Sequence, residues 1–298
     1  MKVRKAVITA AGFGSRFLPF VKNIPKEMVP IIDKPSIQYL VEECLEAGIE
    51  EIIIVTRDEH SLIEEYFTKP ADNVKALLEL QGKMERFAPV QDVLNMTNIK
   101  FVQQRPDYPY GNGSPILSAK PFLNEGEPFA MLWGDDMVMT KNGQKGAISQ
   151  LIEFFESHEC DAVMAVQKTP QEELSRYGVI KTKDEDFENG FGTVAGLIEK
   201  PKMEDAPSDL VSYGRQICPY RVFDFLNPEV TGKDNELWFQ DANDKLSQVG
   251  KFMYKIIDGQ WMTTGDPIRY LEAQINYYLQ NEKLGEDTKK LLAKMTQG

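Results

Sequence analysis

The alternation of short apolar runs with amphipathic segments over the first 170 residues is the feature that most constrains the fold. Residues 35–47 illustrate the helical pattern, because Ile37, Leu40, Val41 and Cys44 fall on one face of a helix. Continuously apolar strands separated by helices are typical of a parallel sheet that is covered on both faces. The predicted strands are 4–11, 50–56, 99–104, 128–133 and 161–168, and the predicted helices 35–47, 59–67, 74–86 and 146–157.

After residue 178 the pattern changes, because strand-like runs follow one another at 178–183, 193–199 and 211–218. These runs predict a smaller, partly antiparallel portion. The sequence thus predicts an α/β fold, with a Rossmann-like, mostly parallel mixed sheet flanked by helices, this antiparallel portion, and C-terminal helices from Pro267 onward. We expect one domain over 1–298, made of parts at about 1–175, about 176–260 and about 267–298.

Charge restricts the partners. The net charge is −12, from 34 basic and 46 acidic residues, so the average field repels a nucleic acid. Residues 1–40 hold seven cations and two anions, a local +5, and the rest of the chain therefore carries −17. This basic N-terminal region is either a solvated surface stripe or the place where a small anionic ligand, rather than DNA or RNA, binds.

Cysteine and histidine usage narrows the chemistry. Three cysteines without a CxxC pair favour a reducing compartment, and no apolar run approaches the ~18 residues that cross a bilayer. We therefore expect a cytoplasmic protein that contacts no membrane. With only His60 and His158, a three-histidine zinc site is impossible. Chemistry that uses Lys, Arg, Asp and an oxygen-bound metal is favoured.

A glycine-rich turn, AAGFGSR at 10–16, follows the first predicted strand. Glycines let backbone N–H groups approach a phosphate, and Arg16 adds positive charge. Phe17 stands where the dinucleotide-binding fingerprint requires a third glycine, and the Gly-Lys-Ser/Thr of a Walker A loop is absent. A phosphate-binding turn of another class is indicated, with a purely structural turn as the alternative.

Three further positions carry charged side chains near the ends of apolar runs. Lys26, between Pro25 and Pro30, is a candidate point charge for a triphosphate, or else an exposed loop lysine. Asp135 follows the strand 128–133 and suits Mg²⁺, which takes oxygen ligands and usually one or two carboxylates plus substrate phosphates; a capped turn is the alternative. In the pair Glu199-Lys200, the acid would bind sugar hydroxyls and the base would bind a sugar phosphate.

Taken together, these motifs resemble those of the bacterial-type UTP–glucose-1-phosphate uridylyltransferases (UDP-glucose pyrophosphorylases) among the sugar nucleotidyltransferases. The most specific stretch is residues 5–56, and the similarity extends over nearly the whole chain. The later motifs follow in family order: FVQQ (101–104), GDD (134–136), RYGVI (176–180), IEKPK (198–202), APSDLVSYGR (206–215) and DNELWFQDA (234–242). The resemblance implies Mg²⁺-dependent transfer of UMP from UTP to glucose 1-phosphate, giving UDP-glucose and pyrophosphate.

The same resemblance implies a role for each matching residue. Ala10, Ala11, Gly12 and Gly14 would form the nucleotide loop, with Glu27, Gln104 and Gly113 reading the uracil; Arg16 and Lys26 would hold the triphosphate, Asp135 the Mg²⁺, Gly178 and Glu199 the glucose hydroxyls, and Lys200 the sugar phosphate. The sugar phosphate is already a nucleophile, so no general base is required. A homodimer or homotetramer built partly from the C-terminal helices is also implied, although Tyr277 to Leu279 would equally pack within the chain.

The sequence departs from the family pattern in three places, of which the mildest is the glycine turn, where Phe13 and Ser15 stand in place of the typical Leu and Thr. Residues 111–115 read GNGSP where the family usually has GLGHA, and Thr263 stands where members often carry an aspartate. Which base the protein selects, and whether it has a second acidic metal ligand, are therefore two questions that the sequence leaves open. The alternatives are another sugar 1-phosphate or dTTP as substrate, or a non-catalytic paralogue that binds a nucleotide sugar.

Overall fold

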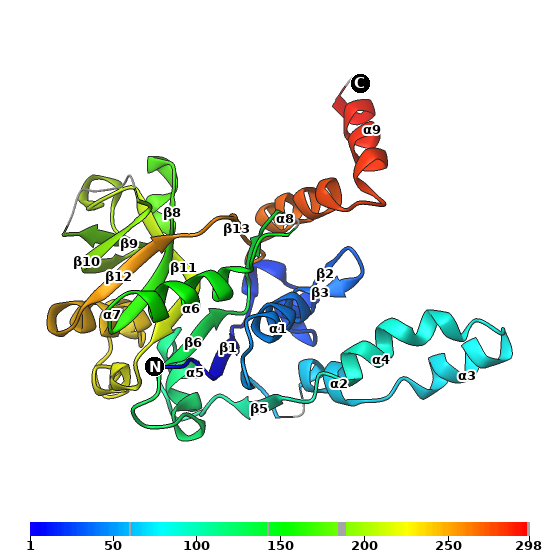
Figure 1. The fold of residues 1–298 in the computed structure, drawn as a ribbon, viewed down its shortest axis with the longest axis horizontal. Helices are drawn as coiled ribbons and strands as arrows, with labels where there is room; N and C mark the ends of the chain where they lie inside the picture. The colour runs from blue at the N-terminus through cyan, green and yellow to red at the C-terminus, as the bar shows by residue number, and fades with distance from the viewer. Residues whose placement is uncertain (60, 142, 184–188, 297–298) are drawn as a thin grey trace.

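A nine-stranded mixed sheet forms the centre of the molecule (Figure 1). The computed structural model describes residues 1–59, 61–141, 143–183 and 189–296. The strands of this sheet are β1 (Lys5–Ala10), β4 (Glu51–Thr56), β5 (Ile99–Gln103), β6 (Phe129–Trp133), β8 (Ala162–Lys168), β9 (Gly178–Thr182), β10 (Phe191–Glu199), β11 (Leu210–Cys218) and β12 (Phe252–Ile256). Their order across the sheet is β5-β4-β1-β6-β11-β8-β12-β10-β9.

Strand directions divide this sheet into two halves. The strands β5, β4, β1 and β6 are all parallel, as the sequence predicts. Next to them, β11 runs antiparallel to both β6 and β8, and β10 runs antiparallel to β12 and β9. The α/β fold with a partly antiparallel portion is confirmed, and that portion continues the same sheet rather than forming a separate one.

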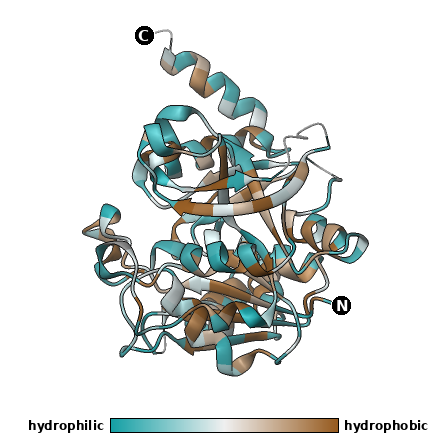
Figure 2. Cartoon of the chain, turned by 90° about the vertical axis from the view of Figure 1, so that its left-hand side faces the viewer, coloured by the Kyte–Doolittle hydropathy of each residue, from teal (hydrophilic) through white to brown (hydrophobic). Residues whose placement is uncertain are grey.

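Helices cover both faces of the sheet. They are α1 (Ser36–Glu46), α2 (Leu62–Thr68), α3 (Asp72–Leu80), α4 (Ala88–Leu94), α5 (Gly113–Ala119), α6 (Ala147–Ser157), α7 (Phe239–Val249), α8 (Pro267–Gln280) and α9 (Gly285–Thr296). Side chains of β1 alternate between two apolar clusters, because Ala6 and Ile8 join α1 and α6 whereas Val7 joins α5 and α7. Figure 2 shows hydrophobic residues gathered in the strands of the sheet.

Several element boundaries differ from the prediction. The segment predicted as a helix at 74–86 is α3, and a 3₁₀ turn at Met84–Phe87 then leads into α4. The predicted loop at 105–115 ends earlier, because α5 already begins at Gly113. Helix α7 and strand β12 were not predicted. Among the described residues, none of the helices has the length and apolar character that crossing a bilayer requires.

Two short ladders lie outside the main sheet. Strands β2 (Pro30–Ile31) and β3 (Lys34–Pro35) form one, and β7 (Asp136–Met139) pairs with β13 (Gln260–Thr263) in the other. The second ladder places Thr263 opposite Asp136. It therefore brings the segment around residue 263 beside the GDD motif, 127 positions earlier in the chain.

Candidate active site

The glycine turn lies at the carboxyl end of β1 and packs against Lys26. A Cβ atom on Gly12 would lie 3.3 Å from Lys26 Cε, and one on Gly14 would lie 3.1 Å from Lys26 Cβ. Gly14 also has φ of 60°, which favours glycine. Arg16 is exposed in the 3₁₀ turn that follows (Ser15–Phe17). The turn thus offers backbone N–H groups and the exposed Arg16 side chain at the predicted phosphate position.

Lys26 is the charged centre of this region. Its Nζ donates a hydrogen bond to Asp135 Oδ2, and Glu27 Oε1 lies 3.9 Å from the same nitrogen. Burial alone would lower the pKa of Lys26, but the attraction of Asp135 and Glu27 outweighs it and holds the pKa above its usual range. Burial opposes ionisation of Asp135 too, yet Lys26 keeps the pKa of Asp135 below its usual range. Both groups are therefore charged at neutral pH.

Glu27 is a buried carboxyl group beside this ion pair. It is 1% exposed, and its Oε2 has no hydrogen-bond partner among the described residues. Burial raises the pKa of Glu27 to about 7, although Lys26 opposes the shift. Gly134 makes this close packing possible, because a Cβ there would lie 2.4 Å from Thr9 O and 3.0 Å from Glu27 Cγ.

The two aspartates of the GDD motif have different environments. Asp135 reaches Lys26, whereas Asp136 Oδ2 accepts a hydrogen bond of 2.8 Å from the Gly214 N–H and is buried. Burial and the nearby Asp135 raise the pKa of Asp136 to about 6. Asp135 is thus the member of the pair that is available to a ligand.

An ion pair between β11 and α1 also contacts the GDD segment. Arg215 on β11 is completely buried and binds both oxygens of Glu43 on α1, with Nε 3.0 Å from Oε1 and Nη2 2.7 Å from Oε2. The same Nη2 donates to Asp136 O at 3.2 Å. Arg215 therefore ties α1, β11 and the GDD segment together.

The surroundings of Asp135 determine which metal the residues fit. The Thr264 N–H donates to Asp135 O at 2.7 Å, and Thr263 Oγ1 lies 3.3 Å from the same carbonyl. No cluster of three His, Cys, Asp or Glu side chains that would hold a metal occurs in the described ranges. One carboxylate fits Mg²⁺ that draws its remaining ligands from phosphates and water, and it does not fit a metal held by protein alone. Threonine at 263 adds no second carboxylate.

The predicted sugar residues meet at the ends of β9 and β10. Glu199 and Gly178 face each other in the ladder, and a Cβ on Gly178 would lie 3.1 Å from Glu199 Oε2. Lys200 adopts φ of 46°, and its Nζ lies 3.7 Å from Glu199 Oε1 and 4.3 Å above the Trp238 ring. The acid, the base and the glycine of the prediction are therefore neighbours.

Of the three predicted base-reading positions, Glu27 lies beside Lys26 as described above, and Gln104 and Gly113 are held by backbone contacts. The Gln104 N–H donates to Thr56 O at 2.7 Å, at the ends of the neighbouring strands β5 and β4. The Gly113 N–H donates to Leu237 O at 2.8 Å, and a Cβ on Gly113 would lie 2.9 Å from that oxygen. The glycine at 113 is thus required by the close approach of the chain at Leu237.

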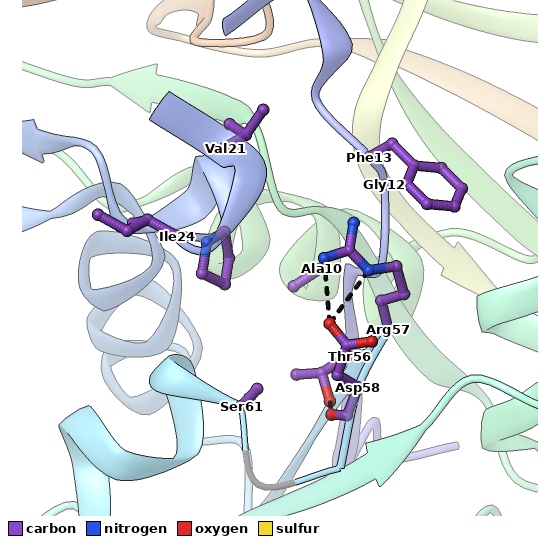
Figure 3. Close-up of a pocket in the computed structure, with 10 residues that line it drawn as sticks. Ala10, Gly12, Phe13, Val21, Ile24, Thr56, Arg57, Asp58 and Ser61 are labelled. Carbon is purple, nitrogen blue, oxygen red and sulfur yellow. Dashed lines mark hydrogen bonds and ion pairs between the residues drawn. The ribbon is translucent and has the colours of Figure 1, made fainter. Parts of the chain in front are cut away.

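A small cavity beside the glycine turn adds residues that sequence reasoning missed (Figure 3). It is lined by Ala10, Gly12 and Phe13 from the turn, and by Arg57 and Asp58 from the end of β4. The Arg57 guanidinium lies 4.9 Å above the Phe13 ring and pairs with Asp58 at 3.0 Å. The sequence could have indicated Arg57 and Asp58, because they directly follow the predicted strand 50–56 and ligands of parallel sheets bind at the carboxyl ends of strands.

His158, the histidine that the structure describes, lies outside this site. His158 stacks on Phe154 at the end of α6, with ring centroids 3.9 Å apart. His60 lies outside the described residues.

Proteins that resemble this chain in sequence and in fold are nucleotidyltransferases. The family model of the nucleotidyl transferases matches residues 5–280. A UTP–glucose-1-phosphate uridylyltransferase of Streptococcus pyogenes is 38% identical over 295 residues, which covers 99% of this chain and 95% of that protein.

Solved structures give the same result. A UDP-glucose pyrophosphorylase from Acinetobacter baumannii has a TM-score of 0.86 at 31% identity, covering 98% of this chain and 99% of that one. A UTP-bound form from the same organism has a TM-score of 0.85 at 32% identity, with the same coverage. A UDP-glucose complex of a UDP-glucose pyrophosphorylase has a TM-score of 0.80 at 31% identity, covering 94% and 100%. The chain is a nucleotidyltransferase and belongs to the UTP–glucose-1-phosphate uridylyltransferase family.

Proposed function

We propose that the protein transfers UMP from UTP to glucose 1-phosphate in a Mg²⁺-dependent reaction that yields UDP-glucose and pyrophosphate. The observation that carries this proposal is the pairing of Lys26 with Asp135 against the glycine turn, with Lys200 and Glu199 grouped at the ends of β9 and β10. A cation for the triphosphate, a carboxylate for the metal and a cation for the sugar phosphate are the minimum that this reaction needs.

In the proposed mechanism, a phosphate oxygen of glucose 1-phosphate attacks the α-phosphorus of UTP in line. The new P–O bond forms as the bond to the β-phosphate oxygen breaks, and pyrophosphate leaves. Lys26 and Arg16 neutralise the triphosphate, and Lys200 holds the sugar phosphate in line for attack. No side chain needs to remove a proton, because the attacking phosphate is already anionic.

Mg²⁺ bound at Asp135 would supply charge neutralisation at the α-phosphate. The Asp135 carboxylate is ionised and carries the Lys26 ammonium as its partner. We propose that Lys26 turns from Asp135 to the triphosphate when UTP and Mg²⁺ bind. Each residue would then have a new partner of opposite charge, the phosphates for Lys26 and Mg²⁺ for Asp135. Thr263 contributes at most a neutral oxygen.

The alternatives remain another sugar 1-phosphate, dTTP in place of UTP, and a non-catalytic paralogue that binds a nucleotide sugar. They rest on the substituted segments 111–115 and 263–266. We also propose a cytoplasmic homodimer or homotetramer built partly from the C-terminal helices. Tyr277 packs against Tyr39 within the chain, with ring centroids 5.2 Å apart.

A panel of nucleoside triphosphates and sugar 1-phosphates, assayed by pyrophosphate release with and without Mg²⁺, tests this function. We expect release with UTP and glucose 1-phosphate only when Mg²⁺ is present. UDP-glucose binding in calorimetry without any pyrophosphate release would instead support the binding paralogue.

The site assignment is tested by Asp135→Asn and Lys200→Ala. Each change removes charge stabilisation of the transition state, so we expect turnover to fall at least ~100-fold. Asp92→Asn and Lys75→Ala, at exposed positions on α4 and α3, are the matched controls and should keep normal turnover. Wild-type turnover in Asp135→Asn would overturn the assignment.

A further inference from the structure

Asn112 makes an unusual contact for a residue at the start of a helix. It precedes α5 but makes no side-chain hydrogen bond to that helix. Its Oδ1 instead accepts a hydrogen bond of 2.8 Å from the Phe239 N–H, at the first residue of α7. Asn112 therefore caps a helix that lies 127 positions further along the chain, through one of the residues in which this chain departs from its family.

This contact determines how two amide groups are oriented. The Phe239 N–H can only donate, so the Asn112 atom that faces it must be the oxygen, and Asn112 Nδ2 must be the donor toward Gln240. That donor lies 3.2 Å from Gln240 Oε1. The Nε2 of Gln240 therefore points away from Asn112, and it donates no hydrogen bond within the described part of the chain.

Gln240 lies at the predicted sugar residues. A Cβ on Gly178 would lie 3.2 Å from Gln240 Cγ, and 3.1 Å from both Glu199 Oε2 and Ser212 Oγ. Gln240 is 7% exposed, and its Oε1 is held by Asn112, which leaves its Nε2 as the donor that a ligand at this position can meet. An amide donor that gains a partner from a bound polar ligand adds to the binding free energy.

We infer that Gln240, oriented by Asn112, donates a hydrogen bond to a ring hydroxyl of the hexose 1-phosphate and is a specificity-determining residue for the sugar. This inference rests on the proposed function. It also gives the substituted 111–115 segment a role. In this segment Asn112 orients Gln240 near the sugar, and Gly113 is the residue predicted to read the uracil. With a hydroxyl oxygen as the acceptor, a sugar that lacks this hydroxyl loses the interaction.

The test compares Gln240→Met with the wild-type enzyme on glucose 1-phosphate and on its 2-, 3-, 4- and 6-deoxy analogues. Methionine keeps the side-chain length and removes the donor. We expect kcat/KM for glucose 1-phosphate to fall about 10-fold in the variant, as loss of one neutral hydrogen bond implies. For one deoxy analogue the variant and the wild-type enzyme should be equally active, and KM for UTP should stay unchanged. Gln248→Leu, at an exposed position on the same helix, is the control.

A second variant tests the orienting role of Asn112. In Asn112→Asp, a carboxylate oxygen still accepts from the Phe239 N–H, but the group can no longer donate to Gln240. The Gln240 amide should then turn its Nε2 toward position 112, so the variant should lose the same discrimination between glucose 1-phosphate and that one analogue.

Each outcome separates the inference from the proposed function. An equal loss on all five sugars in Gln240→Met overturns the inference and leaves the function intact. A wild-type enzyme that releases no pyrophosphate with any sugar 1-phosphate overturns the function, and the inference falls with it. Unchanged kcat/KM for glucose 1-phosphate in Gln240→Met also overturns the inference, provided that circular dichroism shows a folded variant.

Discussion

The Glu27 carboxyl group couples the stability of the protein to pH. Its pKa is about 7 in the folded protein and 4.5 in the unfolded chain, so the folded state holds the proton more tightly. The stabilisation that this group provides is present below pH 4.5 and is lost as the pH rises through 7. At pH 8 the charged group therefore costs up to about 3 kcal/mol of folding free energy.

Glu27→Gln should remove this dependence, because the amide does not titrate. We expect the free energy of unfolding of the variant, relative to the wild type, to rise by up to about 3 kcal/mol between pH 4.5 and pH 8. Urea denaturation at both pH values measures it. If the two proteins keep a constant difference across this range, Glu27 is not the titrating group.

At the residue level, the sequence predicted side chains that follow strand ends and missed those whose partners are distant. Asp135 and Glu199 were found because a strand places its last residues at the edge of the sheet. Trp238 and Gln240 belong to the quoted motif DNELWFQDA, but nothing in its spacing reveals that Trp238 packs under Lys200 or that Asn112 binds Gln240.

Among the elements, α1 and β11 are joined by an ion pair whose Arg215 side chain is completely buried and whose Glu43 side chain is 12% exposed. Removing Glu43 leaves the Arg215 guanidinium buried and unpaired, and it also removes the acceptor of the Ile148 N–H on α6. We expect Glu43→Ala to lower the free energy of unfolding by about 3–5 kcal/mol. Glu42→Ala is the neighbouring control, because Glu42 pairs with Lys34 at the surface and should cost at most about 1 kcal/mol. Similar losses in both variants would contradict the prediction.

Elements with a clean apolar period were predictable, and elements defined by tertiary pairing were not. Helix α7 buries the polar side chains of Gln240, Asn243 and Ser247 beside Phe239 and Leu246, so its apolar stripe is interrupted. Asn243 is satisfied by Gln216 on β11, at 2.9 and 3.0 Å. Only the folded sheet supplies that partner, and the same applies to the β7–β13 ladder.

For the whole molecule, helix α9 is the element that projects from the body (Figures 1 and 2). Its Leu291 and Met295 are 58% and 70% exposed. If the proposed oligomer uses this helix, Leu291→Glu with Met295→Glu should reduce the molecular mass measured by light scattering toward that of a monomer. Ala293→Glu, at an exposed position on another side of α9, should leave the mass unchanged. The same mass in all three proteins would exclude α9 from the interface.

The continuity of the sheet has a consequence for how substrates are enclosed. Strands β6 and β11 are hydrogen-bonded neighbours, and they join the half that carries Asp135 to the half that carries Gly178 and Glu199. The two halves cannot swing apart as rigid bodies without breaking that ladder. The distance between the two substrate positions is therefore set by this paired backbone before either substrate arrives.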